Sequence, residues 1–111
     1  MIINIQEKPE ATLLELGEER LDAHNSGDLK NEMLSLFEDG KNQLVIDLKE
    51  VRFIDSSGLG ALVSGYKNAS ARNGNLKLCA LQPQVKSMFE LTRLHRVFEI
   101  YPGSEEALAS F

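Results

Sequence analysis

Two short segments open the chain, residues 2–7 and 11–16, and the residues Lys8-Pro9-Glu10 separate them. This spacing is typical of two strands that are joined by a tight turn. The polar residues 17–22 that follow show no periodic apolar pattern, so they are expected to form a loop. The pattern therefore predicts an opening β-hairpin.

Helical spacing of apolar residues recurs three times after the hairpin. The first helix is expected to start at Asn25 or Ser26, either of which can cap its free amides, and to end at Gly40. Proline is tolerated in the first turn of a helix, so the third helix is expected to start at Pro83. The predicted core-facing positions are Leu29, Met33, Leu36 and Phe37 in the first helix, Leu59, Leu62, Val63 and Tyr66 in the second, and Val85, Met88 and Phe89 in the third.

Apolar segments at residues 44–48, 76–81 and 97–101 alternate with these helices and predict further strands. Residue 104 begins a short final helix. Because a helix lies between successive strands, the strands are expected to run parallel, with right-handed crossovers. The sequence thus predicts an α/β fold, in which a mixed sheet of four to five strands is opened by a hairpin and has helices mainly on one face. Residues 1–111 suit a single domain.

The composition is that of an ordinary globular protein, with 42% hydrophobic and 26% charged residues. A net charge of -5 argues against nucleic-acid or anionic-lipid partners, and no segment reaches membrane-spanning length. A cytoplasmic protein is therefore expected. The single cysteine, Cys79, excludes an internal disulfide, and two lone histidines, His24 and His95, fall short of a metal-ligand cluster. No metal or cofactor is expected, and Cys79 is interpreted as a small buried side chain.

The chemistry of this sequence is concentrated in Asp55-Ser56-Ser57-Gly58-Leu59-Gly60, between a predicted strand and a predicted helix. Residues just before a helix present free amides at its positive end, where an anionic group is favoured. Asp55 or Ser56 can cap the helix, and Gly58 and Gly60 are expected to let another molecule approach the backbone closely. Capping alone selects the same residue types, so the local pattern leaves a structural and a functional interpretation open.

The pattern extends beyond this motif, over residues 45–48, 51–62, 74–78 and 85–89. In these segments the chain resembles the anti-anti-sigma factors of the STAS domain family. The resemblance implies the STAS fold, and it implies that Ser56 is phosphorylated by an anti-sigma factor that is itself a serine kinase. Unphosphorylated, such a protein binds the anti-sigma factor and frees the sigma factor. A PP2C-type phosphatase resets it.

The segment 20–26 resembles the second contact region of that family and is expected to lie near Ser56. Its Leu21-Asp22 matches a Gly-x-Leu-Asp turn, but Glu19 stands where that pattern has glycine. A solvated loop with an ordinary helix cap remains the alternative for this segment. We expect a monomer or weak homodimer. The predicted partner contacts are Asp22, His24, Asn25, Asp55, Ser56, Ser57, Gly58 and Leu59.

Two other classes of function compete with this switch. An enzyme would use Ser56 or Ser57 as a nucleophile, but no general base is apparent and the Gly-x-Ser-x-Gly elbow is missing, so no catalytic activity is expected. The other class is a STAS module that acts without phosphorylation, either as a scaffold in a signalling or transport assembly or as a nucleotide sensor. The sequence has no Gly-x-x-x-x-Gly-Lys-Ser/Thr loop, which weakens only the nucleotide version.

Overall fold

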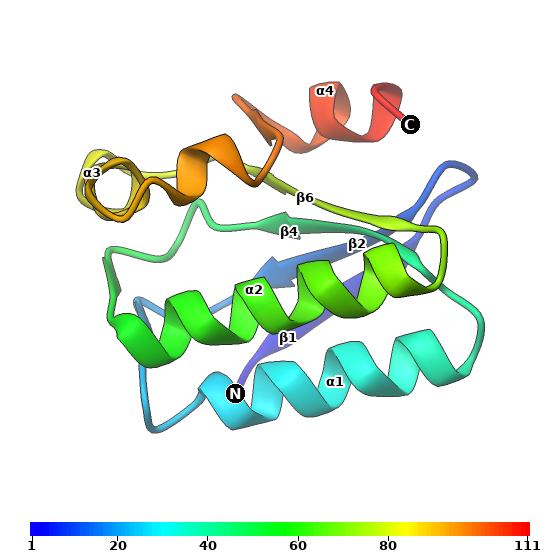
Figure 1. The fold of residues 1–111 in the computed structure, drawn as a ribbon, viewed down its shortest axis with the longest axis horizontal. Helices are drawn as coiled ribbons and strands as arrows, with labels where there is room; N and C mark the ends of the chain where they lie inside the picture. The colour runs from blue at the N-terminus through cyan, green and yellow to red at the C-terminus, as the bar shows by residue number, and fades with distance from the viewer.

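Two helices run along one face of a five-stranded sheet in the computed structural model, which describes residues 1–111 (Figure 1). The strands are β1 (Ile3–Glu7), β2 (Thr12–Leu16), β3 (Arg20–Leu21), β4 (Gln43–Asp47), β5 (Phe53–Ile54), β6 (Asn75–Cys79) and β7 (Ile100–Tyr101). The helices are α1 (Ser26–Glu38), α2 (Ser56–Ala71), α3 (Pro83–Leu91) and α4 (Ser104–Ala109), with a short 3-10 helix at Leu94–Arg96.

The large sheet has the strand order β1-β2-β4-β6-β7. Its first two strands pair antiparallel, with Ile5 opposite Leu14, and every other pair in the sheet is parallel. The predicted hairpin, the mixed sheet and the parallel strands are thus confirmed. The last strand is shorter than the predicted 97–101, because the backbone amides of Val97 and Phe98 bond back to the carbonyl of Leu94 and extend a helical turn there.

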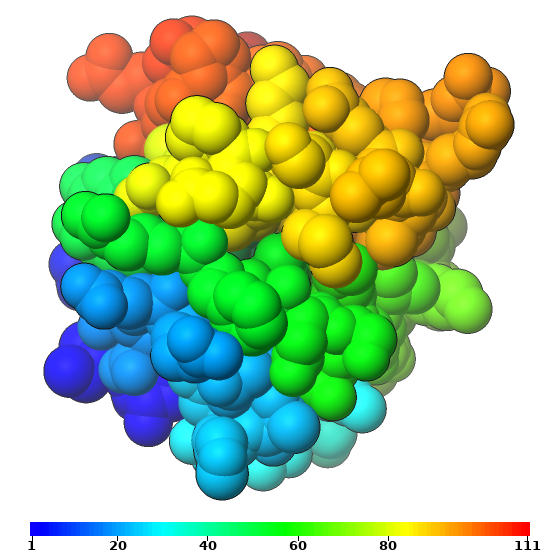
Figure 2. Space-filling view, turned by 90° about the vertical axis from the view of Figure 1, so that its left-hand side faces the viewer, coloured from blue at the N-terminus to red at the C-terminus, as the bar shows by residue number.

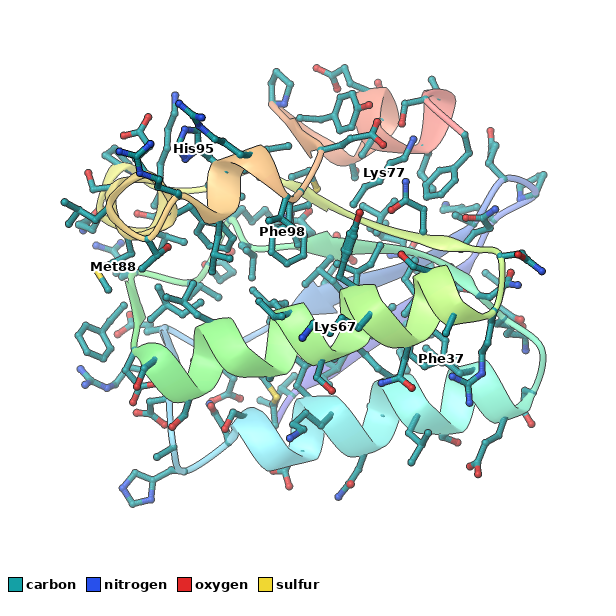
Figure 3. The ribbon with its side chains drawn as sticks, viewed as in Figure 1. Phe37, Lys67, Lys77, Met88, His95 and Phe98 are labelled. Carbon is teal, nitrogen blue, oxygen red and sulfur yellow. The ribbon has the colours of Figure 1, made fainter.

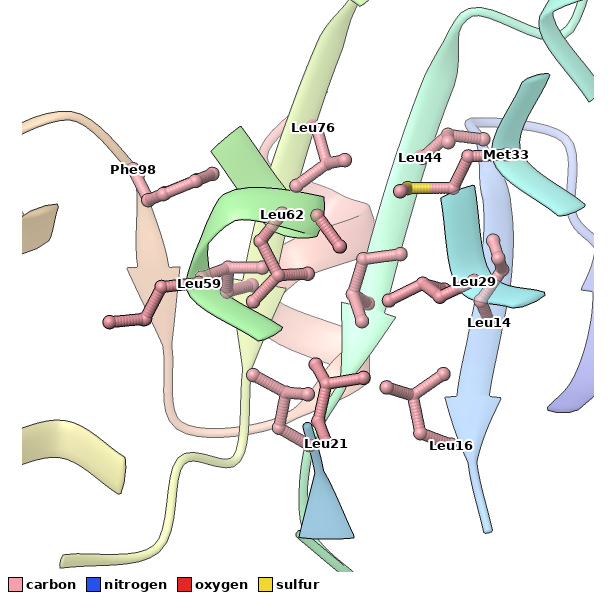
Figure 4. Packing of buried hydrophobic residues seen from close by; sticks show 14 of the residues in the cluster. Leu14, Leu16, Leu21, Leu29, Met33, Leu44, Leu59, Leu62, Leu76 and Phe98 are labelled. Carbon is pink, nitrogen blue, oxygen red and sulfur yellow. The ribbon is translucent and has the colours of Figure 1, made fainter. Parts of the chain in front are cut away.

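The main core lies between this sheet and the pair of helices α1 and α2 (Figure 4). All the predicted core positions of α1 are buried, and in α2 Leu59 and Leu62 are buried while Val63 and Tyr66 are partly buried against the core. In α3, Val85 and Phe89 are buried, whereas Met88 is only partly covered. Each fully buried leucine of this core stabilises the fold by about 2 kcal/mol.

The short helix α4 packs on the opposite face of the sheet, over a smaller apolar cluster that includes Leu13, Val45 and Cys79. Lys77 points to this side and is 4% exposed. Its ammonium group donates to the side-chain oxygen and the carbonyl of Ser110, at 2.8 and 3.0 Å, so this lysine helps to hold the end of α4 against the sheet.

A second, two-stranded sheet lies where the sequence predicted only a loop. In it, β3 pairs parallel to β5, with Arg20 opposite Phe53 and Leu21 opposite Ile54. The carbonyl of Glu19 accepts a further bond from the amide of Arg52 at 2.7 Å. A strand of two residues has no periodicity that a sequence pattern can reveal. This pairing ties the segment before α1 to the segment before α2.

Candidate docking surface around Ser56

Ser56 is the first residue of α2, and its side chain is exposed, as is that of Ser57. The preceding residue, Asp55, has extended backbone and caps the helix, because its Oδ1 accepts the amide of Gly58 at 2.9 Å. Of the two predicted caps, Asp55 is the one that the structure uses. The hydroxyl of Ser56 makes no hydrogen bond within the chain and is exposed to solvent.

Asp55 also joins the two segments of the predicted contact region. Its Oδ2 accepts the backbone amide of Ala23 at 3.3 Å, and its own amide donates to the carbonyl of Leu21 at 3.3 Å. In Figure 2 the blue segment 20–25, the green start of α2 and the yellow α3 adjoin on one face of the molecule. The predicted proximity of residues 20–26 to Ser56 is therefore confirmed.

The segment around Asp22 is a turn held by its own side chains. Oδ1 of Asp22 accepts the amide of His24 at 3.0 Å, and Oδ2 lies 3.3 Å from Nε of Arg20. The bond from the His24 amide, together with Arg20, lowers the pKa of Asp22 below its ordinary value. His24 is exposed and Asp22 is partly exposed, so both are accessible beside Ser56.

Asn25 does not have the predicted capping role. It occupies the N-cap position of α1, but its side chain makes no cap bond to the helix. Instead, its Oδ1 accepts the amide of Asp22 at 2.9 Å and its Nδ2 donates to the carbonyl of Arg20 at 2.7 Å. The side chain of Asn25 therefore closes the turn before α1 that contains Asp22 and His24, and it does not cap the helix.

Two of the predicted partner contacts, Gly58 and Leu59, are buried. A side chain at Gly58 would meet the carbonyl of Leu21 and Cγ1 of Ile54, so this glycine lets the first turn of α2 approach β3 closely. The prediction that Gly58 opens the backbone to another molecule is wrong, because Leu21 and Ile54 already occupy that space. Gly60 is exposed, and a Cβ atom added to it would have nothing within 4 Å.

A groove of about 430 Å³ borders Ser56. Its apolar walls come from Phe53, which is 43% exposed, and from Ile54 and Met88, while Arg52, Asp55 and Gln84 add polar groups. The guanidinium of Arg20 lies 4.2 Å from the ring centre of Phe53, in a cation–π contact at the edge of the groove. The sequence does not predict Phe53 and Gln84 as site residues, and it predicts Met88 as a core residue, because only the approach of α3 to β5 forms this groove.

The family model of the STAS domain matches residues 3–107. This chain belongs to the STAS domain family. The anti-sigma-B factor antagonist of Bacillus subtilis is 33% identical to it over 85 residues, which cover 77% of each chain. The resemblance predicted from the sequence is thus confirmed.

Solved structures show the same STAS fold. An anti-sigma-factor antagonist domain protein from Planctomyces limnophilus has a TM-score of 0.88 at 23% identity, over 97% of this chain and 96% of that one. The Bacillus cell fate determinant SpoIIAA in its phosphorylated form has a TM-score of 0.76 at 19% identity, over 98% of each chain. These likenesses confirm the predicted fold.

The remainder of this STAS domain shows no second site of cysteine or metal chemistry. Cys79 is buried, and burial together with Asp47 raises the pKa of its thiol to about 12, so it is chemically inert at neutral pH. No cluster of His, Cys, Asp and Glu side chains is arranged to hold a metal ion. None of the helices combines the length and the apolar character that a membrane span requires.

Proposed function

We propose that this STAS protein is an anti-sigma factor antagonist that is switched at Ser56. In its unphosphorylated form it binds an anti-sigma factor with serine kinase activity and thereby releases the sigma factor. Phosphorylation of Ser56 by that kinase abolishes binding, and a PP2C-type phosphatase restores it. The observation that carries the proposal is the exposed Ser56 hydroxyl at the entrance of a capped helix, beside an apolar groove.

The groove supplies the energy of docking in this proposal. Phe53 and Met88 are apolar side chains that remain partly open to water in the free protein, so a partner side chain that covers them gains hydrophobic free energy. Asp22, His24 and Ser57 supply polar contacts at the margin of the same surface. Gly58 and Leu59 support the surface from beneath instead of touching the partner.

Phosphorylation acts on this surface through charge. It adds about -1.5 to -2 charges next to Asp55, in a region that loses water when a partner docks. The positive end of α2 tolerates a phosphate in the free protein, so the repulsion and desolvation appear mainly in the complex. A penalty of about 3 kcal/mol lowers the affinity roughly a hundredfold, which is enough for a switch without any refolding.

The proposal is tested with a kinase-type anti-sigma factor and ATP. Phosphopeptide mass spectrometry should find phosphate on Ser56, and Ser56→Ala should remove it. Ser57→Ala is the matched control, because it deletes the neighbouring exposed hydroxyl and should leave the modification in place. Phosphate on Ser57 alone, or on neither serine, contradicts the proposal.

Binding to the same anti-sigma factor separates the switch from a STAS scaffold that works without phosphorylation. The switch predicts that Ser56→Ala binds as tightly as the unmodified protein and that Ser56→Asp binds poorly. Equal binding by both variants favours the scaffold. Addition of a PP2C-type phosphatase to the phosphorylated protein should restore binding to its original affinity. The cytoplasmic location and the monomeric or weakly dimeric state remain predictions.

A further inference from the structure

A second cavity of the molecule lies away from Ser56. It has a volume of about 490 Å³ and opens where β6 and β7 end, between α3 and the turn at Pro102. The volume is in the range of small-molecule sites, and the ends of parallel strands are a common position for such sites. Ala80 has a φ of 60° and turns the chain out of the sheet directly after β6, which leaves this space in front of α3.

Apolar groups form most of the lining of this cavity. Leu81 and Ile100 are partly covered, and Phe98, which is 5% exposed, packs edge to face against Phe89 in the core behind. The ring of Tyr101 is also part of the lining, and its hydroxyl is bonded to Glu99 at 2.8 Å. A ligand that enters the cavity therefore meets aromatic and aliphatic carbon that is fixed by the core.

Charged side chains of both signs stand at the edge of the cavity. Lys86 and Glu90 lie one helical turn apart on α3, and neither takes part in an ion pair within the chain. His95 completes the edge, and its Nδ1 lies 3.3 Å from the carbonyl of Phe89. When Nδ1 donates to that carbonyl, Nε2 keeps its lone pair and can accept a hydrogen bond from a ligand.

We propose that this cavity binds a small zwitterion with an aromatic side group, that is, an aromatic amino acid or a close analogue. The ligand carboxylate would bind Lys86, and the ligand ammonium would bind Glu90, with Nε2 of His95 as a further acceptor. The aromatic group would lie on Leu81 and Ile100, the partly exposed apolar side chains of the lining. Charge complementarity selects this class, because an unpaired cation and an unpaired anion one turn apart match the two adjacent charges of an α-amino acid.

The cavity is separate from the Ser56 groove, since α3 lies between them. Gln84 and Met88 face the groove. Lys86 comes two positions after Gln84, and Glu90 comes two positions after Met88. Two positions correspond to about 200° around a helix, so Lys86 and Glu90 face the cavity on the other side. Figure 3 shows Met88 below α3 and His95 above it. The proposal therefore does not depend on phosphorylation of Ser56.

The test is a titration of the isotope-labelled chain, followed by the NMR shifts of its backbone amides. The probes are L-phenylalanine, 3-phenylpropionate, which lacks the ammonium group, and 2-phenylethylamine, which lacks the carboxylate. L-phenylalanine should give saturable shifts at residues 80–81, 86–90 and 98–101 and bind about fivefold more tightly than either analogue. Absence of saturation, shifts centred on residues 53–56, or equal affinities of the three probes would overturn the proposal.

Substitutions at the edge of the cavity test the assigned contacts. Lys86→Gln and Glu90→Gln should each weaken binding of L-phenylalanine about fivefold, because each removes one charge and little else. Lys67→Gln is the matched control, since Lys67 is an exposed lysine on α2 outside the cavity. An unchanged affinity in both cavity variants, or an equal loss in the control, contradicts the assignment.

Discussion

Gly58 provides the sharpest test of how the Ser56 surface is built. It lies in the first turn of α2, where the helix meets the backbone of β3. A Cβ atom at this position would overlap the carbonyl oxygen of Leu21 and lie 2.8 Å from Cγ1 of Ile54. The first of these is a backbone atom, so it cannot move aside as a flexible side chain does. In Gly58→Ala, the start of α2 must therefore shift away from β3.

The expected cost follows from two opposing effects. Overpacking against fixed neighbours destabilises a protein by about 1 to 3 kcal/mol. Alanine regains up to about 1 kcal/mol of helix propensity relative to glycine, and less in the first turn. Gly58→Ala should therefore lower the free energy of unfolding by about 1 to 2 kcal/mol. The same shift strains the bond between Asp55 and the amide of Ala23, so it also disturbs the docking surface.

Urea unfolding of two alanine variants measures this effect. Gly60→Ala is the matched control, because it lies in the same helix with nothing within 4 Å of its added carbon. It should raise the free energy of unfolding by about 0.5 to 1 kcal/mol through helix propensity alone. If Gly58→Ala proves as stable as Gly60→Ala, the close approach of α2 to β3 is not what requires glycine at position 58.

Three further predictions concern other parts of the domain. Asp55→Ala should lose about 1 kcal/mol of stability in thermal unfolding, because the Gly58 amide loses its cap, whereas Asp55→Ser should keep most of it; equal losses would rule out capping as the cause. The pKa of Asp22 is lowered in the folded state, so its bond to the amide of His24 contributes stability above the ordinary value of 3.8 and is lost only as the pH falls through the lowered value. The NMR shift of the His24 amide should therefore titrate with a midpoint below pH 3.8, and a midpoint at or above pH 3.8 would refute the assignment. Cys79 should react with a disulfide reagent at pH 8 only after unfolding, since its pKa of about 12 and its burial suppress the thiolate; rapid labelling of the native protein would contradict this.

The groove residue Met88 shows the difference between a local pattern and a tertiary site. Its spacing from Val85 and Phe89 correctly placed one side of it toward the core. The other side lies in the groove only because α3 approaches β5, whose residues are far away in the sequence. Periodicity reports which face of a helix is apolar, and it does not report what a neighbouring element leaves uncovered.

Local patterns in the chain were enough to predict the order of the main helices and strands, the core face of α1 and the position of Ser56 at a helix entrance. These features depend on residues a few positions apart, where spacing and capping act directly. Long-range packing, in contrast, is what pairs β3 with β5 and buries Gly58 against Leu21 and Ile54. The contact between Ala23 and Asp55 spans 32 positions, and only packing of the whole chain selects contacts at that separation.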